Sequence, residues 1–378
     1  MYLPGSARFG QIRNLRLNNN IQNMKKLIKI FLSLSLPLPF LLCGCQESPK
    51  EKTLGMDVIE NSHVLQADTI DLSGIDIPTS QYLYVYNDSN LIVKNYKRDG
   101  NYLIELYNLH TKKLYRKLFR IGRGHGEVLL CETRIEGNRM FVQDFQQQKF
   151  CIVNLDSAFS EKEYTPVLQN MQDRGISTVA FLNGKQIVGN SYAFNDERAG
   201  IHQEGEKLLT SDKYAIEQKK EHKYNVQNVA SAGQIIVKPD NEKVVYADGN
   251  QSFIGLYDKN LKRELTITGP IDLKTKYHIS KEKEVVFKKE IPYTYTDGYC
   301  TSDEFGLIYY GTLVDAMNYD FDKRTCHLFI FDWDGNLKKS YKLNCHVKAI
   351  TPSQKYPGSY YICSGGENTE LKLLRVHE

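Results

Sequence analysis

Short runs rich in Tyr, Val, Ile and Phe recur along most of this chain, and turn-forming residues separate them. The first group shows the arrangement, with runs at residues 82–86, 91–93 and 102–107 separated by turns that contain Asn, Asp and Gly. β-Branched and aromatic residues favour strands, whereas Asn, Asp and Gly favour the turns that join them. Almost no segment after residue 62 has apolar residues at helical spacing. The sequence therefore predicts a nearly all-β domain.

Groups of this kind repeat at a period of roughly 40 to 55 residues, and six of them can be counted. The small sheet that each group predicts cannot bury both of its faces alone. Sheets stacked around an axis cover one another and leave only short edges. We therefore predict an all-β fold, a six-bladed β-propeller over residues 62–378, with a β-sandwich as the structural alternative. A strand at residues 68–72 is expected to close the ring by pairing with the last blade.

In several groups the third run ends in an acidic or amide residue, which precedes a turn containing Gly or Asn. The clearest example is residues 331–337, where Asp332 is followed by Asp334, Gly335 and Asn336. Gly and Asn tolerate positive φ, so the pattern predicts a hairpin. Two acids at alternate positions also begin a calcium-binding loop, but the Glu that such a loop requires is missing. We therefore predict a plain hairpin here.

A secretion signal is predicted near the N-terminus. Met24 begins a cationic stretch, and residues 30–42 form a short apolar run that Ser and Pro residues interrupt. This run is shorter than the roughly 20 apolar residues that a membrane-spanning helix needs, but its layout is that of a signal peptide. It ends at Leu42-Cys43-Gly44-Cys45, with an aliphatic residue three places before the last cysteine and a small one directly before it. The pattern matches a lipobox, which predicts that Cys45 becomes the lipid-carrying first residue of the mature protein.

These assignments divide the chain into three parts. Residues 1–44 are the signal peptide together with an upstream stretch before the natural start, which we place at Met24. Residues 45–61 are polar and charged and are predicted to be a lipidated, flexible tether. Residues 62–378 form the propeller domain. The expected location is the cell envelope, with the lipid in the outer membrane and the propeller on its periplasmic or surface face.

The charge of the chain depends on this processing. The full chain has 49 Lys and Arg against 45 Asp and Glu, a formal net charge of +4. Removing residues 1–44 takes away six bases and no acids, so 43 bases then face 45 acids and the net charge becomes −2. No dense block of Lys and Arg remains to follow a phosphate backbone. We therefore predict no nucleic-acid partner.

Few residues are arranged for metal binding or catalysis. The nine histidines are scattered, no paired Cys/His spacing occurs, and no Gly-x-Ser-x-Gly nucleophile motif is present. We therefore predict no metal site, no cofactor and no catalytic residue. The mature part keeps six cysteines, and both disulfides and buried thiols remain open for them.

A glycine-dense loop within residues 119–129 carries the most specific sequence signal. It resembles the Gly-x-Gly-Pro-Gly-Glu-Phe signature that follows the first blade in TolB-like six-bladed propeller lipoproteins of Bacteroides-type bacteria. His125 replaces the usual Pro, and Val128 replaces the usual Phe. The glycines do not fit the G-x-G-x-x-G spacing of dinucleotide sites. We expect Glu127 to cap backbone N–H groups and Arg123 to face solvent or a ligand. The candidate binding loop consists of Gly122, Arg123, Gly124, His125, Gly126 and Glu127.

The resemblance, together with the lack of catalytic motifs, predicts a non-catalytic binding or protein-interaction module that its lipid anchors to the membrane. The ligand, a protein, peptide or glycan, stays unidentified. The alternative is a polysaccharide lyase or hydrolase with its site at the central axis, and a third possibility is a scaffold for an outer-membrane protein complex. The 25 tyrosines suit carbohydrate or peptide surfaces. Loop residues expected on a propeller face are the aromatics Tyr192, Phe194, Tyr293, Tyr295 and Tyr299, with Arg123, His125 and Arg198 near them.

Overall fold

The computed structural model divides the chain into two units, Met1–Ser48 and Pro49–Glu378. The predicted signal peptide, the start at Met24 and the lipidation site Cys45 lie outside the described residues and stay predictions. Among the described residues, no helix combines the length and the apolar character needed to cross a membrane. The structure describes residues 48–75, 77, 80–95, 102–144, 146–170, 176–183, 186–191, 199–203, 206–211, 233–282, 285–315, 325–365 and 371–378.

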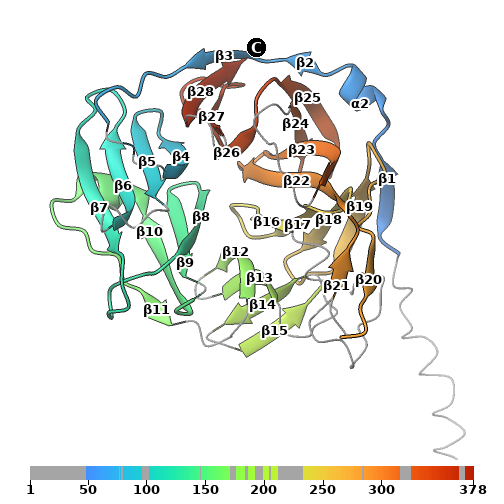
Figure 1. The fold of residues 1–378 in the computed structure, drawn as a ribbon, viewed down its shortest axis with the longest axis horizontal. Helices are drawn as coiled ribbons and strands as arrows, with labels where there is room; N and C mark the ends of the chain where they lie inside the picture. Colours follow the sequence, from blue (N-terminus) through green and yellow to red (C-terminus); the bar gives the residue numbers. More distant parts are fainter. Residues whose placement is uncertain are drawn as a thin grey trace, which may run out of the picture. The chain divides into compact units, whose positions relative to one another are not determined.

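The unit Pro49–Glu378 is a ring of six sheets, or blades, around a central axis (Figure 1). This arrangement confirms the predicted six-bladed β-propeller and excludes the β-sandwich. Blade 1 contains β4 (Ser80–Tyr86), β5 (Asn90–Asn95), β6 (Tyr102–Asn108) and β7 (Leu114–Arg120). Blade 2 contains β8 (Cys131–Glu136), β9 (Arg139–Asp144), β10 (Lys149–Asn154) and β11 (Gln169–Asn170). Blade 3 contains β12 (Ile176–Asn183), β13 (Gln186–Ser191), β14 (Gly200–Gln203) and β15 (Glu206–Thr210).

The other three blades each include a strand from the N-terminal part of the unit. Blade 4 contains β16 (Gly233–Val237), β17 (Lys243–Asp248), β18 (Phe253–Asp258), β19 (Arg263–Thr268) and β1 (Lys50–Thr53). Blade 5 contains β22 (Glu290–Cys300), β23 (Glu304–Asp315), β24 (Cys326–Asp332), β25 (Leu337–Leu343) and β2 (His63–Val64). Blade 6 contains β26 (Val347–Pro352), β27 (Tyr360–Ser364), β28 (Lys372–His377) and β3 (Gln66–Thr69). Outside the blades lie the hairpin of β20 (Tyr277–Ile279) and β21 (Val285–Phe287) and the short helices α2 (Asp57–Glu60) and α3 (Leu155–Ser160).

The position of a strand within its blade determines how much of it is buried. The second strands β5, β9 and β17 are buried along almost their whole length because neighbouring blades cover both of their faces. The outer strand β7 exposes most of its first half. This difference explains why the sequence shows continuous apolar runs in the middle of each group and mixed composition at its end.

The turn predicted at residues 331–337 is present. The side chain of Asp332 accepts hydrogen bonds from the N–H groups of Asp334 (3.0 Å) and Asn336 (2.8 Å), and Gly335 has a φ of 73°. A capping side chain of this kind replaces hydrogen bonds that the backbone loses where the strand ends. The same cap follows the third strand of two other blades, at Asn108 and Asp258, whereas Asn154 at the end of β10 caps the N-terminus of helix α3.

Residues 50–69, which we call the strap, run along the outer edges of blades 4, 5 and 6 (Figure 1). Strand β1 pairs in parallel with β19, β2 pairs in parallel with β25, and β3 pairs antiparallel with β28. Strand β3 thereby joins the start of the propeller to its last blade. The predicted closing strand is confirmed, although it spans Gln66–Thr69 rather than residues 68–72.

The strap differs from the predicted flexible tether at residues 45–61. The propeller unit begins at Pro49 rather than at residue 62. The N–H of Leu54 donates to the carbonyl of Thr268 (2.8 Å), and the side chains of Leu54, Val58 and Ile59 pack against the core between blades 4 and 5. The polar composition misled the prediction because β1 pairs through its backbone while most of its side chains stay exposed.

The two possibilities left open for the cysteines are decided in favour of thiols. All six cysteines of the propeller are unpaired, and four of them are buried. Burial raises the pKa of Cys131 and of Cys151 to about 12. A thiol with so high a pKa is a poor nucleophile, so these side chains serve to fill the core.

Candidate functional site

The candidate binding loop connects β7 of blade 1 to β8 of blade 2. Its two ends are held together by hydrogen bonds from the N–H of Gly122 to the carbonyl of Val128 and from the N–H of Val128 to the carbonyl of Arg120, both 3.0 Å long. Between them, the Glu127 carboxylate accepts the N–H of Gly124 (2.8 Å), which is the expected cap. A Cβ atom on Gly122 would lie 1.9 Å from a Glu127 carboxylate oxygen. Glycine is therefore required at this position for the carboxylate to lie over the turn.

Three side chains from blade 2 support this loop, and sequence analysis missed all three. Asp144, fully buried at the end of β9, accepts the N–H groups of Leu129 (2.6 Å), Gln146 (2.9 Å) and Gln147 (3.0 Å). The side-chain amide of Gln147 donates to the carbonyl of Gly122 (2.9 Å), and the Lys149 ammonium donates to that of Gly124 (2.9 Å). The loop is thus a fixed connection that presents the exposed side chains of Arg123 and His125.

A second group of polar and aromatic side chains faces the axis of the ring. The first strand of each blade lies nearest the axis (Figure 1). Tyr82 and Tyr84 alternate on β4, and their rings are stacked with centroids 6.2 Å apart. The charge of Asp297 on β22 raises the pKa of both tyrosines further, after the dominant effect of burial. Blades 1 and 5 are not neighbours in the ring, so these side chains interact across its centre.

Blade 2 supplies most of the charged members of this group. Glu132 lies 3.4 Å from the Lys94 ammonium, which also lies 4.7 Å from the centre of the Tyr82 ring. Further along β8, the Arg134 guanidinium contacts the Glu136 carboxylate at 3.1 Å and acts electrostatically on Asp297. We call the whole set the axial cluster, and it consists of Tyr82, Tyr84, Lys94, Glu132, Arg134, Glu136, Arg139, Tyr293 and Asp297.

The side chain of Asp297 is shielded from water, and this shielding changes its pKa. Burial raises its pKa to about 6, although the N–H of Gly298, the charge of Arg134 and the N–H of Ile350 act in the opposite direction. The hydrogen bond from the N–H of Ile350 (2.9 Å) joins the first strands of blades 5 and 6. Burial also raises the pKa of Glu136, against the charges of Arg134 and Arg139. The axis therefore contains acids that hold a proton at higher pH than usual.

The cluster has balanced charge and mixed hydrogen-bonding capacity. Three cations face three acids, and the tyrosines add hydroxyl groups that donate and accept. The members differ in exposure, since the Lys94 side chain is 4% exposed and that of its partner Glu132 is 63% exposed. Glu132 is therefore the charged member of the cluster most accessible to a ligand. Glu132 follows the candidate loop directly on β8, so both lie at the same end of the first strands.

The aromatic residues that were predicted to lie on a propeller face differ in their positions. Tyr293 belongs to the axial cluster and packs against Tyr310 with centroids 4.7 Å apart. Tyr295 is buried and donates its hydroxyl hydrogen to a backbone carbonyl, and Tyr299 is buried and bonds to Glu304. Tyr192, Phe194 and Arg198 lie outside the described residues. The sequence offered one signal against a loop here, which is the alternation of residues along β22. Residues 293, 295, 297 and 299 all lie within this one strand, so they cannot be loop positions.

In the part of the chain that the structure describes, no group of three or more His, Cys, Asp or Glu side chains is placed to hold a metal ion. The described side chains of the axial cluster offer hydrogen bonding, ion pairing, aromatic contact and proton exchange by carboxyl groups. Such a set of groups suits the recognition of a polar molecule.

The ring of six blades belongs to a recognised class of β-propeller. Residues 67–355 match the family model described as TolB-like 6-blade propeller-like, and the chain belongs to this family. A search among curated proteins finds no significant match.

Two solved structures are similar in fold. A protein from Bacteroides fragilis NCTC 9343, described as a candidate exported protein, is 10% identical, with a TM-score of 0.50 over 87% of this chain and 99% of that chain. A member of the DUF4221 family from Bacteroides vulgatus is also 10% identical, with a TM-score of 0.48 over 84% and 96% of the two chains. At this level of identity the likeness concerns the fold alone.

Proposed function

We propose that this protein is an envelope lipoprotein, anchored through Cys45 in the outer membrane, whose propeller is a non-catalytic module that binds a protein, peptide or glycan. The lipobox at residues 42–45 supports the anchor. The likeness to a candidate exported protein agrees with a location outside the cytoplasm. The observation that carries the binding role is the axial cluster, and above all its pair of Lys94 and Glu132.

The energetic argument concerns the charges near the axis. A ring that served only as a stable scaffold is best filled with apolar side chains, because burying charged groups costs free energy even when they are paired. Here Lys94 is almost fully buried, whereas its carboxylate partner is largely exposed. A ligand that donates hydrogen bonds to Glu132 gains charge-assisted contacts beside a buried cation and the Tyr82 ring.

A ligand screen followed by matched variants tests this site. The unit from Pro49 onward is compact, so it is used in glycan and peptide arrays, and the hits are measured by calorimetry. Glu132→Gln is expected to weaken binding by about tenfold, which corresponds to the loss of one charge-assisted contact. Glu264→Gln is the matched control, because Glu264 forms an ion pair with Lys243 at the outer side of blade 4. Equal affinity of the Glu132 variant and the wild type would place the binding site elsewhere.

The anchor has its own test. In cells supplied with labelled palmitate, the wild-type chain is expected to carry the label and to sediment with the outer membrane. Cys45→Ser is expected to lose both properties, while Cys43→Ser keeps them because Cys43 lies before the cleavage point. A labelled Cys45→Ser protein would contradict the anchor.

One observation favours a second candidate, a polysaccharide lyase or hydrolase with its site at the axis. Asp297, with a pKa of about 6, has the acidity required of a group that exchanges protons near neutral pH. Its neighbours Tyr84 and Arg134 are groups that can orient a sugar and stabilise negative charge. Incubation with a polysaccharide panel decides between the two. New reducing ends or unsaturated products that disappear in Asp297→Asn would replace the binding function by an enzymatic one.

A further inference from the structure

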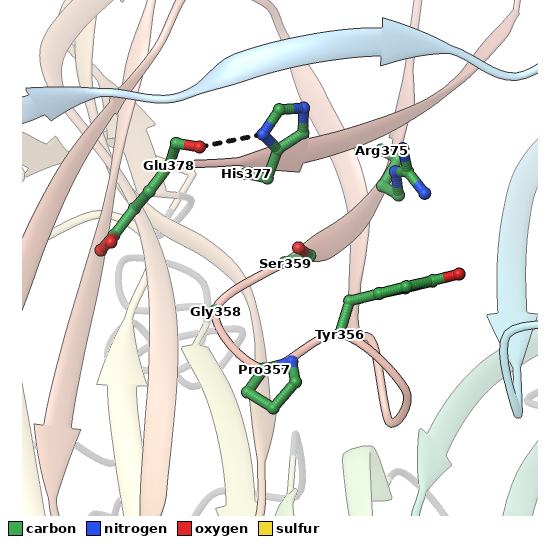
Figure 2. A pocket seen from close by; sticks show the side chains of 7 residues that line it. All are labelled: Tyr356, Pro357, Gly358, Ser359, Arg375, His377 and Glu378. Atoms are coloured by element: carbon green, nitrogen blue, oxygen red, sulfur yellow. Dashed lines mark hydrogen bonds between the residues drawn. The ribbon is translucent and has the colours of Figure 1, made fainter.

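Blade 6 carries a cavity of about 380 Å³ that belongs neither to the axial cluster nor to the candidate loop (Figure 2). It lies where the turn between β26 and β27 meets the end of β28. The candidate loop leads into a first strand, whereas this turn follows one, so the two lie on opposite faces of the ring. The cavity is lined by Tyr356, Pro357, Gly358, Ser359, Arg375, His377 and Glu378.

The turn that forms one wall is fixed in shape. The N–H of Ser359 donates to the carbonyl of Tyr356 (3.0 Å), and Gly358 between them has a φ of 78°. Proline at the second position and glycine at the third are what a type II turn requires. The side chain of Tyr356, 40% exposed, is thus presented by a rigid turn.

Asp88, in the first turn of blade 1, anchors the same segment from the neighbouring blade. Its carboxylate accepts the N–H groups of Gln354 (3.0 Å) and Lys355 (2.9 Å), the hydroxyl of Tyr361 (3.0 Å) and that of Ser353. These bonds order the segment before any ligand arrives. A preorganised wall avoids the entropic cost of ordering a loop on binding.

Strand β28 adds two side chains to the lining, Arg375 and His377, and both donate hydrogen bonds to the strap. One carboxylate oxygen of Asp68, on the strap, accepts from Arg375 (3.1 Å) and from His377 (3.2 Å). These two hydrogen bonds lower the pKa of Asp68. The Arg375 guanidinium also lies 5.4 Å from the centre of the Tyr356 ring, and Figure 2 shows both side chains on the same side of the cavity.

Glu378, which follows β28, also lines the cavity, and its side chain points away from Tyr356 and Arg375 (Figure 2). The Glu378 carboxylate, 61% exposed, accepts from the Lys339 ammonium at 2.9 Å and from the Tyr341 hydroxyl. The cations and carboxylates around the cavity are therefore largely paired with one another. Such pairing leaves donors and acceptors in place but little net charge to attract an ion.

We propose that this cavity binds a neutral sugar ring of a glycan. The apolar C–H face of a sugar ring suits the exposed ring of Tyr356, and its hydroxyl groups need both donors and acceptors, which the Arg375 guanidinium and the Ser359 hydroxyl supply. The volume lies at the lower end of the roughly 300 to 1,000 Å³ that is usual for small-ligand sites. This site goes beyond the proposed function, since it is separate from the axis and does not depend on the lipid anchor.

Saturation-transfer NMR with the unit from Pro49 onward tests the proposal. The probes are glucose, galactose, mannose, N-acetylglucosamine and short oligomers of each, with glucuronic acid as the anionic comparison. At least one neutral sugar is expected to show transfer to its ring protons. Tyr356→Ala should weaken its binding by about tenfold, and Tyr356→Phe, which keeps the ring, by no more than about twofold.

Three controls keep the result interpretable. Tyr115→Ala removes another exposed tyrosine, on β7 of blade 1, and should leave sugar binding unchanged. Glu264→Gln, at the outer side of blade 4, should also leave it unchanged. Thermal unfolding of Tyr356→Ala checks that the variant is folded. The proposal is overturned if no neutral sugar shows transfer, if folded Tyr356→Ala binds as the wild type does, or if glucuronic acid binds about tenfold more tightly than every neutral sugar.

Discussion

Blades 4 to 6 and blades 1 to 3 follow the same plan of strands, but only blades 4 to 6 receive an outer strand from the strap. Blades 4 and 5 thereby become five-stranded, and blade 6 gains its fourth strand. The outer strands of blades 1 to 3 are β7, β11 and β15, each contributed by the blade's own stretch of sequence. The half of the ring that contains both ends of the unit Pro49–Glu378 is therefore the half that the strap reinforces.

The buried clusters between the blades differ in their aromatic content. Between blades 4 and 5 the buried cluster includes Phe305, Phe329, Phe331 and Trp333. Between blades 2 and 3, within the residues that the structure describes, it includes Phe141 and Ile187, with Phe150 and Ile152 partly buried beside them. The candidate binding loop and most charged members of the axial cluster lie on blades 1 and 2. Recognition groups are thus concentrated in the half without the strap.

The largest expected effect compares these two cores. Phe331→Ala removes a ring that is fully buried and stacked on Phe305 at 5.2 Å, and we expect it to cost about 3 to 5 kcal/mol of unfolding free energy. Phe141→Ala removes a ring that is 6% exposed and stacked on the partly buried Phe150 at 6.0 Å, and it should cost about 2 kcal/mol because this ring is less completely buried than Phe331. Urea unfolding of both variants gives the two values. Equal losses would show that the two cores are equivalent.

The second largest expected effect concerns the contribution of the strap to the stability of the ring. Leu65, between β2 and β3, is 6% exposed in the core between blades 5 and 6, so Leu65→Ala is expected to cost about 2 to 3 kcal/mol. Its neighbour Val64 is 50% exposed, and Val64→Ala should change stability by less than about 0.5 kcal/mol. Thermal and urea unfolding measure both. If the two variants are equally stable, the strap lies on the ring without supporting it.

A pH-dependent effect is expected at the contact between blades 5 and 6. Folding raises the pKa of Asp297 from 3.8 to about 6, so the folded protein binds this proton more tightly than the unfolded chain. The contribution of Asp297 to stability is therefore full below pH 4 and is lost as pH rises through about 6. The loss amounts to roughly 1 to 3 kcal/mol. In Asp297→Asn, which keeps an acceptor for the N–H of Ile350, this dependence should disappear from urea unfolding measured between pH 4.5 and 7.5. A variant with an unchanged pH slope would assign the dependence to another group.

The smallest effect concerns the polar contacts of β1. The Lys52 ammonium donates to the Asn336 side chain (2.6 Å) and to the carbonyl of Gly335 (3.3 Å), which joins the strap to a turn of blade 5. This contact is near solvent, so Lys52→Met should cost less than about 1 kcal/mol. A loss as large as that of Leu65→Ala would mean that polar contacts rather than apolar burial hold the strap.

Local patterns made the blades predictable from the sequence. The hairpin at Asp332 is encoded within a few residues, since the capping carboxylate and the groups that it accepts are all nearby in the chain. The closing strand was predictable because a propeller needs one end of the chain to complete its last blade. The glycine-dense loop was recognisable because Glu127 caps an N–H only three residues away.

Groups that meet only in three dimensions could not be predicted. Tyr82, Arg134 and Asp297 are far apart in sequence, and nothing near any of them marks a shared environment. The cavity of blade 6 combines Asp68 of the strap with Arg375 of the last strand, and its rigid wall depends on Asp88 of blade 1. The polar composition of β1 gave no indication of a strand, because an edge strand that pairs through its backbone needs no apolar side chains.

The strap also constrains the order of events when the chain folds. It precedes every blade in the sequence, yet Thr53 contacts Thr268, 215 residues later, and Asp68 contacts His377, 309 residues later. Because a chain is synthesised from its N-terminus, the strap is made long before the strands with which it pairs. Contacts between such distant residues form slowly because closing a long loop lowers the entropy of the chain. We expect the ring to remain open, with blades 4 to 6 missing their outer strands, until the last blade has been made.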